Sequence, residues 1–181
     1  YSNGYAFTYA NAAPQGIGVW TETAAAHTAY QGGMSEWCGN CHGDMHNISY
    51  PTTLKHPSGA IIDGLAANYN IYNGTGNYNG VAATAYLPEV PFEDSDASRD
   101  TATTSGPNTT TSKVMCLTCH RAHASSAPYA GRWDFNVTIM GDDGVESGAF
   151  TQPNPYAATA GDDQRSLCNK CHLKDPVDPN P

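Results

Sequence analysis

Large aliphatic side chains are scarce in this sequence. Its 181 residues include only 6 Leu, 6 Ile, 7 Val and 4 Phe. A chain this poor in apolar bulk, with a net charge of −9, has the composition of many disordered proteins. Yet charged residues make up only 14%, and there are 11 Tyr and 3 Trp. We therefore expect something other than Leu and Val to build the core.

Positive charge and long apolar runs are lacking as well. Lys and Arg total 8, against 17 Asp and Glu. This balance argues against nucleic acid as a partner, because proteins that bind it carry basic surfaces. No segment approaches the roughly 20 apolar residues of a membrane-spanning helix. The length suits one domain, and we treat residues 1–181 as a single unit.

The cysteines are the strongest signal in the chain. All six fall into three copies of Cys-x-x-Cys-His, the attachment signature of c-type haem. The two thiols bond the haem vinyl groups, and the adjacent His reaches the iron. Disulfides would not explain why a His follows every second cysteine. Zinc would not explain it either, and a zinc site built from two Cys-x-x-Cys pairs would leave the third pair unused. The predicted haem-binding residues are Cys38, Cys41, His42, Cys116, Cys119, His120, Cys168, Cys171 and His172.

Three haems also account for the missing aliphatic core. Each is a large apolar plate, and burying apolar area stabilises a fold by about 25 cal/mol per Å² whatever supplies it. We therefore predict a haem-cored fold that is mostly coil, with a few short helices around the attachment sites and one β-hairpin. The hairpin is expected over residues 132–150, where two β-prone runs flank a Gly-Asp turn.

The remaining segments are mostly turn-rich and polar. Residues 69–80 repeat Tyr, Asn and Gly, which predicts successive turns. Residues 93–112 are expected to be a polar connector between the first and second haem regions. Asp162 or Asp163 is expected to cap a helix over the third attachment motif. Four Asn-x-Ser/Thr sequences begin at Asn47, Asn73, Asn108 and Asn136. Three acidic clusters are expected to be solvated rather than to bind Ca²⁺, namely Glu93-Asp94-Ser95-Asp96, Asp142-Asp143 and Asp162-Asp163.

Seven histidines are available to ligate three irons. Three of them belong to the motifs, which leaves four for three distal positions. We therefore predict bis-histidine ligation throughout, which gives a lower potential than Met/His ligation. The candidate distal ligands are His27, His46, His56 and His123. His56 lies in a turn before a proline, and either His27 or His46 is expected to be the spare.

Two candidate distal ligands closely follow a motif. His46 comes four residues after His42, and His123 comes three residues after His120. On a continuous helix each would share a face with its neighbour, so it could not reach the far side of the same ring. We expect His46 to bind the second haem and His123 to bind the first.

The motifs and their surroundings resemble secreted multihaem c-type cytochromes of metal-reducing and other electron-exporting prokaryotes. The likeness lies in WCGNCHGDMHN, KHPSG, VMCLTCHRAH and GRWDF. Some members of this class polymerise into extracellular filaments, the cytochrome nanowires, in which a His of one subunit can complete a haem of the next. The resemblance makes His27 a candidate for such a ligand. Nanowire subunits mostly carry four or more haems, whereas this chain has three motifs.

This resemblance implies extracellular electron transfer through three closely packed haems, in a filament built from copies of this chain. Other cytochromes or extracellular electron acceptors would be its redox partners. A soluble monomeric shuttle, periplasmic or extracellular, is the alternative. A multihaem reductase is a third interpretation, but it needs an iron with an open position, and the histidine count argues against one. We expect an electron carrier rather than an enzyme.

Overall fold

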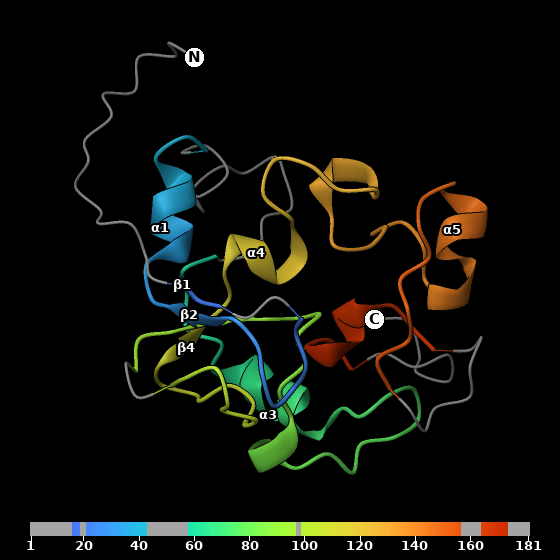
Figure 1. Cartoon of the computed structure of the whole chain (residues 1–181). Coiled ribbons are helices and arrows are strands. Elements are labelled where there is room, and N and C mark those ends of the chain that lie inside the picture. Colours follow the sequence, from blue (N-terminus) through green and yellow to red (C-terminus); the bar gives the residue numbers. More distant parts are fainter. Residues whose placement is uncertain (1–15, 19–20, 43–57, 97–98, 157–163, 174–181) are drawn as a thin grey trace.

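The computed structural model describes residues 16–18, 21–42, 58–96, 99–156 and 164–173 of the chain. Most of these residues are coil, which confirms the predicted fold class (Figure 1). The elements are β1 (Gly16–Ile17), β2 (Ala29–Gln31), α1 (Met34–Gly39), α3 (Gly64–Ile71), η1 (Ala82–Thr84), β3 (Glu93–Asp94), β4 (Ser112–Lys113), α4 (Cys116–Cys119), η2 (Pro128–Ala130), η3 (Met140–Asp142), α5 (Asp143–Glu146) and η5 (Leu167–Lys170). The helices that the structure describes are all too short or too polar to cross a lipid bilayer.

A small sheet joins segments that are far apart in the sequence. Its strand order is β1-β2-β3-β4, and each strand is two or three residues long. β1 and β2 are antiparallel, β2 and β3 are parallel, and β3 and β4 are antiparallel. Tyr30 of β2 pairs with Glu93, and Glu93 pairs with Lys113. The sheet therefore ties the segment before the first Cys motif to the segment before the second.

Aromatic side chains build much of the polypeptide core. Six of the fourteen residues in the main buried cluster are aromatic, centred on Tyr69 and Tyr72 around the end of α3. The Tyr69 hydroxyl donates to the carbonyl of Val90 at 2.9 Å and accepts from the N–H of Leu87 at 3.0 Å. A buried tyrosine needs such partners for its polar end. Tyrosine thus supplies apolar area that the few aliphatic residues do not.

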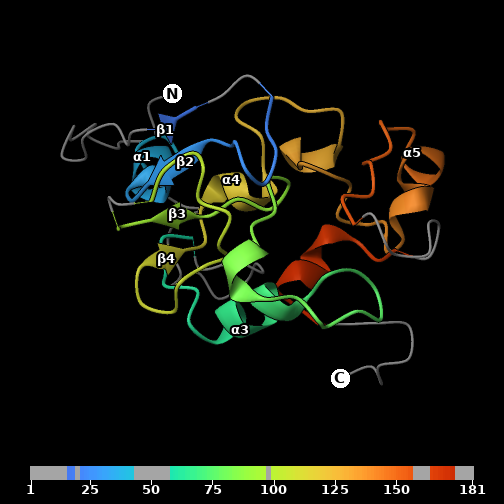
Figure 2. The same ribbon diagram turned by 60° about the horizontal axis from the view of Figure 1, so that its bottom comes forward.

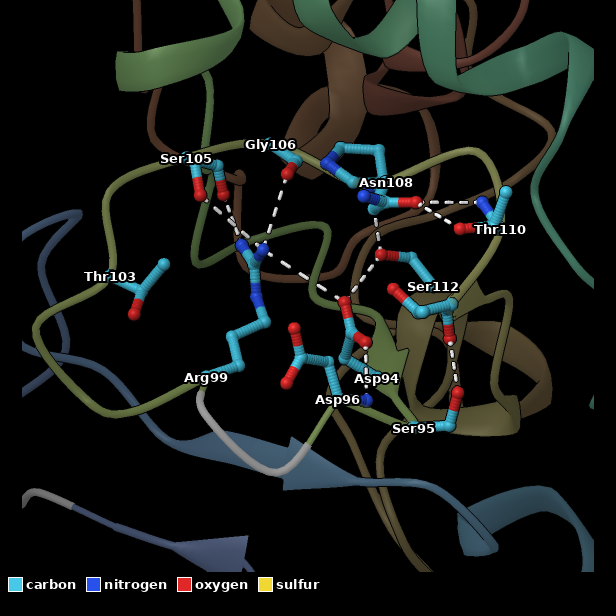
Figure 3. A network of polar contacts seen from close by, with 12 residues as sticks. Asp94, Ser95, Asp96, Arg99, Thr103, Ser105, Gly106, Asn108, Thr110 and Ser112 are labelled. Atoms are coloured by element: carbon cyan, nitrogen blue, oxygen red, sulfur yellow. Dashed lines mark hydrogen bonds and ion pairs between the residues drawn. The ribbon is translucent and has the colours of Figure 1, made fainter.

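The segment predicted to be a polar connector folds back on itself as a closed loop. β3 and β4 pair at its two ends, so residues 95–111 leave and return at the same place. The Asp94 carboxylate accepts a hydrogen bond from the Ser112 hydroxyl at 2.6 Å and lies 3.9 Å from the Arg99 guanidinium. Arg99 also donates to the carbonyls of Ser105 and Gly106, inside the loop (Figure 3).

Two local predictions are wrong. Residues 132–150 form no hairpin, because η3 and α5 occupy the middle of the segment. Residues 69–80 are not turns throughout, since α3 continues to Ile71 and buries Tyr69. The third motif forms a 3-10 turn after Ser166. Asp162 and Asp163, the predicted caps, lie outside the described residues.

Candidate haem-attachment sites

The three Cys-x-x-Cys-His motifs share one local geometry. In each, the histidine N–H donates to the carbonyl of the first cysteine, at 2.9 Å for His42, 3.0 Å for His120 and 2.9 Å for His172. This bond spans four residues and closes a single helical turn. Side chains three and four residues apart on such a turn are neighbours. Each motif therefore places its two thiols and its imidazole close together, as attachment to one porphyrin requires.

The fold brings the three motifs into one row. Both views show α4 between α1 and the C-terminal turn η5 (Figures 1 and 2). A hydrogen bond with Cys116, together with burial, raises the pKa of the Cys38 thiol, so the first and second motifs touch. Burial raises the pKa of Cys119 to about 12, and the nearby thiols of Cys168 and Cys171 add to the shift. The second motif thus touches the first and lies near the third.

The six cysteines all lie within the described residues. No disulfide joins any two of them. Burial raises the pKa of Cys171, like that of Cys119, to about 12. Within the described ranges, no group of three or more His, Cys, Asp or Glu residues is arranged to hold a metal ion.

His120 is held in an orientation that suits an axial ligand. Its Nδ1 lies 3.0 Å from the carbonyl oxygen of Tyr129, and its ring meets that of Phe135 edge-on at 5.3 Å. A hydrogen bond from Nδ1–H to a carbonyl fixes the tautomer and leaves the Nε2 lone pair for a metal. Tyr129 and Ala130 adopt left-handed backbone angles, with φ of 59° and 54°. The tight turn of η2 thus aims this carbonyl at the ring.

The four candidate distal histidines have different surroundings where the structure describes them. His27 is buried, stacks on Tyr86 with ring centroids 3.6 Å apart, and has Nδ1 3.3 Å from the carbonyl of Ala24. His123 is exposed and has a left-handed φ of 66°. The helix expected to carry it is absent, because α4 ends at Cys119 and His120 is extended. His46 and His56 lie outside the described residues, so the ligation scheme stays a prediction.

A residue that sequence reasoning missed supports the first motif. Glu93 of β3 is fully buried, and its Oε2 accepts hydrogen bonds from the N–H groups of Met34 at 2.6 Å and Ser35 at 3.4 Å. Gly33 precedes α1 without a capping side chain, so Glu93 caps this helix from a distant part of the chain. Burial raises the pKa of Glu93 to about 7, and nearby Glu36 adds to the shift. Sequence spacing carries no signal for this contact, which spans 59 residues.

A second missed residue lies beside the other two motifs. Trp133 belongs to the main buried cluster, against which Cys119 and Cys171 pack. Its indole Nε1 is buried and has no hydrogen-bond partner among the described residues. An apolar setting with an unsatisfied donor fits a prosthetic group that is mostly apolar but carries carboxylates. The segment GRWDF carries part of the resemblance to multihaem cytochromes, but the sequence assigns Trp133 no role.

The comparisons with known proteins agree with this reading of the motifs. The C-type cytochrome OmcS of Geobacter sulfurreducens is 39% identical over an alignment of 215 positions, which covers 96% of this chain and 48% of the relative. The chain is related to the c-type cytochromes. No family model matches it.

Two solved structures give the same result for the fold. The Outer Membrane Cytochrome S filament of G. sulfurreducens is 34% identical, with a TM-score of 0.71. The cryo-EM structure of the OmcS nanowires is 36% identical, with a TM-score of 0.72. Each match covers 97% of this chain and 51% of the other. The chain resembles these filament subunits in fold while spanning about half their length.

Proposed function

We propose that this chain binds three c-type haems and conducts electrons along them outside the cell, as one subunit of a polymeric filament. The observation that carries the proposal is the row of three motifs, with thiols of the second motif close to those of both others. Cofactors attached at these points would lie near one another in chain order. The likeness to filament-forming OmcS supports the assembly and the extracellular location.

The chain's residues hold and orient the cofactor. The cysteine pairs supply the two thioether bonds of each haem, and His42, His120 and His172 supply the proximal imidazoles. The Tyr129 carbonyl keeps His120 in the tautomer that leaves Nε2 for the iron. When bound, haem iron accepts and donates single electrons by alternating between its ferric and ferrous states. The proposed role is therefore that of an electron carrier rather than an enzyme.

The distal positions are proposed to be filled by histidine. Four candidates remain for three irons, namely His27, His46, His56 and His123. His27 has the same arrangement as His120, with Nδ1 near a backbone carbonyl. Its imidazole is covered by Tyr86, so donation to a haem of a neighbouring subunit would require this contact to open. Copies of the chain, other cytochromes and extracellular acceptors are the proposed partners.

Intact mass and electron microscopy together test the proposal. We expect the secreted protein to carry the mass of three haems, to give the optical spectrum of low-spin c-type haem, and to form filaments in negative stain. A protein of that mass that stays monomeric would support the soluble shuttle instead. A bare polypeptide would overturn the cofactor assignment. Rapid binding of CO to the reduced protein would indicate an open iron position and favour a reductase.

A further inference from the structure

The indole N–H of Trp133 is a buried donor without an acceptor. Only 4% of the residue is exposed, and Nε1 has no hydrogen-bond partner in the described part of the chain. Folded proteins leave few buried polar groups unpaired, because such a group loses its hydrogen bonds to water and gains none. An acceptor is therefore expected from outside the described polypeptide.

The position of Trp133 indicates which of the three attachment motifs it lies beside. The preceding residue, Arg132, donates its backbone N–H to the carbonyl of Cys119 at 2.8 Å and its Nε to the carbonyl of Leu117 at 2.6 Å. The Trp133 ring meets Phe135 edge-on at 5.7 Å, and Phe135 meets His120 in the same way. Trp133 is thus held beside the second motif by the two hydrogen bonds of Arg132 and by its ring neighbours.

The neighbouring carboxylate, that of Asp134, does not accept a hydrogen bond from the Trp133 indole. Asp134 follows Trp133 directly, but its Oδ1 accepts from the backbone and side-chain N–H groups of Asn136, at 2.8 and 3.0 Å. It is engaged in its own turn. A haem is apolar except for its two propionate carboxylates and therefore suits an aromatic pocket with one buried donor.

We propose that the Trp133 indole N–H donates a hydrogen bond to a propionate of the haem attached at Cys116 and Cys119. This inference rests on the proposed function, since it requires a haem at the second motif. A donor at the propionate offsets part of its negative charge. Because that charge favours the ferric iron, the hydrogen bond raises the reduction potential of this haem above the value it would have otherwise.

The substitution Trp133→Phe removes the donor and keeps an aromatic ring. We expect one of three midpoint potentials, measured by spectroelectrochemistry on the holoprotein, to fall. A threefold shift of the ferric/ferrous equilibrium corresponds to about 28 mV for a one-electron couple. Trp37→Phe is the matched control, because Trp37 is 42% exposed and water replaces any bond its indole loses. Equal potentials in both variants and the parent would overturn the inference.

A measurement on the unaltered protein covers the case in which Trp133→Phe does not fold. The three tryptophans give three indole signals in a ¹H–¹⁵N spectrum of the ferrous holoprotein. The Trp133 signal should show slow hydrogen exchange and should move when the propionates are protonated at low pH. A Trp133 signal that ignores this protonation would refute the propionate bond. Intact mass reports the haem count separately, so loss of the cofactor is not mistaken for loss of this contact.

Discussion

At the scale of single residues, groups outside the three motifs hold the motif residues and their helices in place. The Tyr129 carbonyl holds His120, and Glu93 holds the first turn of α1. Both act from outside the Cys-x-x-Cys-His pattern, so the pattern identifies the attachment residues but not their supports. Glu93 also has an ionisation that differs between the folded and unfolded chain, which makes its role measurable.

Glu93→Gln is expected to remove a pH dependence of stability. The folded-state pKa of Glu93 is about 7, above its usual value of 4.5. Between these values the folded chain holds more protons than the unfolded chain, so the free energy of unfolding falls as pH rises from 4.5 through 7. The glutamine variant should lose this fall and be more stable than the parent at pH 8 by about 1 kcal/mol or more, since one pKa unit is worth about 1.4 kcal/mol.

Denaturant unfolding of the holoprotein between pH 4.5 and 8 measures the effect. Glu146→Gln is the control, because Glu146 is exposed on α5 and should keep the parent's pH dependence. A Glu93→Gln variant whose stability follows the parent across this range would show that the carboxyl titrates alike in both states.

At the scale of elements, specific hydrogen bonds between segments determine the structure more than sequence periodicity does. The loop 95–111 is closed by two residue pairs of β3 and β4 and by the Asp94–Ser112 bond. The Ser112 hydroxyl also accepts from the N–H of Asn108 at 2.8 Å, so one buried side chain fastens both the strand and the loop. Removing it should leave a buried carboxylate oxygen and a backbone N–H with fewer partners.

Ser112→Ala is expected to destabilise the holoprotein by about 1–3 kcal/mol, the usual loss when a buried polar group is left unpaired. Ser95→Ala is the matched control, since Ser95 donates only an exposed hydrogen bond to the carbonyl of Thr111. It should cost about 0.5 kcal/mol or less. The free energies of unfolding and the rate of proteolysis within 95–111 both report the difference. Equal losses in the two variants would mean that the Asp94–Ser112 bond does not close the loop.

The incorrect hairpin over 132–150 shows where local patterns fail. Trp133 and Val137 have β propensity, but both are buried in the polypeptide core rather than paired with a strand. Met140–Asp142 forms a 3-10 turn and Asp143–Glu146 a single α-helical turn. Ile139 forms a bridge to Arg165 instead of pairing within its own segment. Long-range partners thus override the propensity that predicted the hairpin.

At the scale of the whole molecule, the order of the motifs in space matters more than their spacing in sequence. The gaps between motifs are unequal, yet the second motif lies close to both others. The middle haem is therefore proposed to connect the two outer ones. This arrangement predicts that the three attachment sites are not equivalent in electron transfer.

Replacing Cys116 and Cys119 by Ala should interrupt conduction along the chain. The middle haem would be lost, and the outer two would be left without an intermediate. Replacing Cys168 and Cys171 by Ala removes one haem as well but leaves the first and second in contact, so it is the matched control. Intact mass should show two haems in each variant. Internal electron transfer between the remaining haems, followed by flash photolysis, should be slower in the first variant, and equal rates would contradict the proposed order.

The sequence alone predicted haem attachment, because that chemistry depends on a local pattern of thiols and imidazole within five residues. It also identified the coil-rich fold class, since few aliphatic residues and many Gly, Asn and Pro disfavour long regular elements. Only the tertiary structure decided which motifs adjoin, that Glu93 caps α1, and that Trp133 holds an unpartnered N–H. These features join residues tens of positions apart, and such contacts are set by packing that no local pattern encodes.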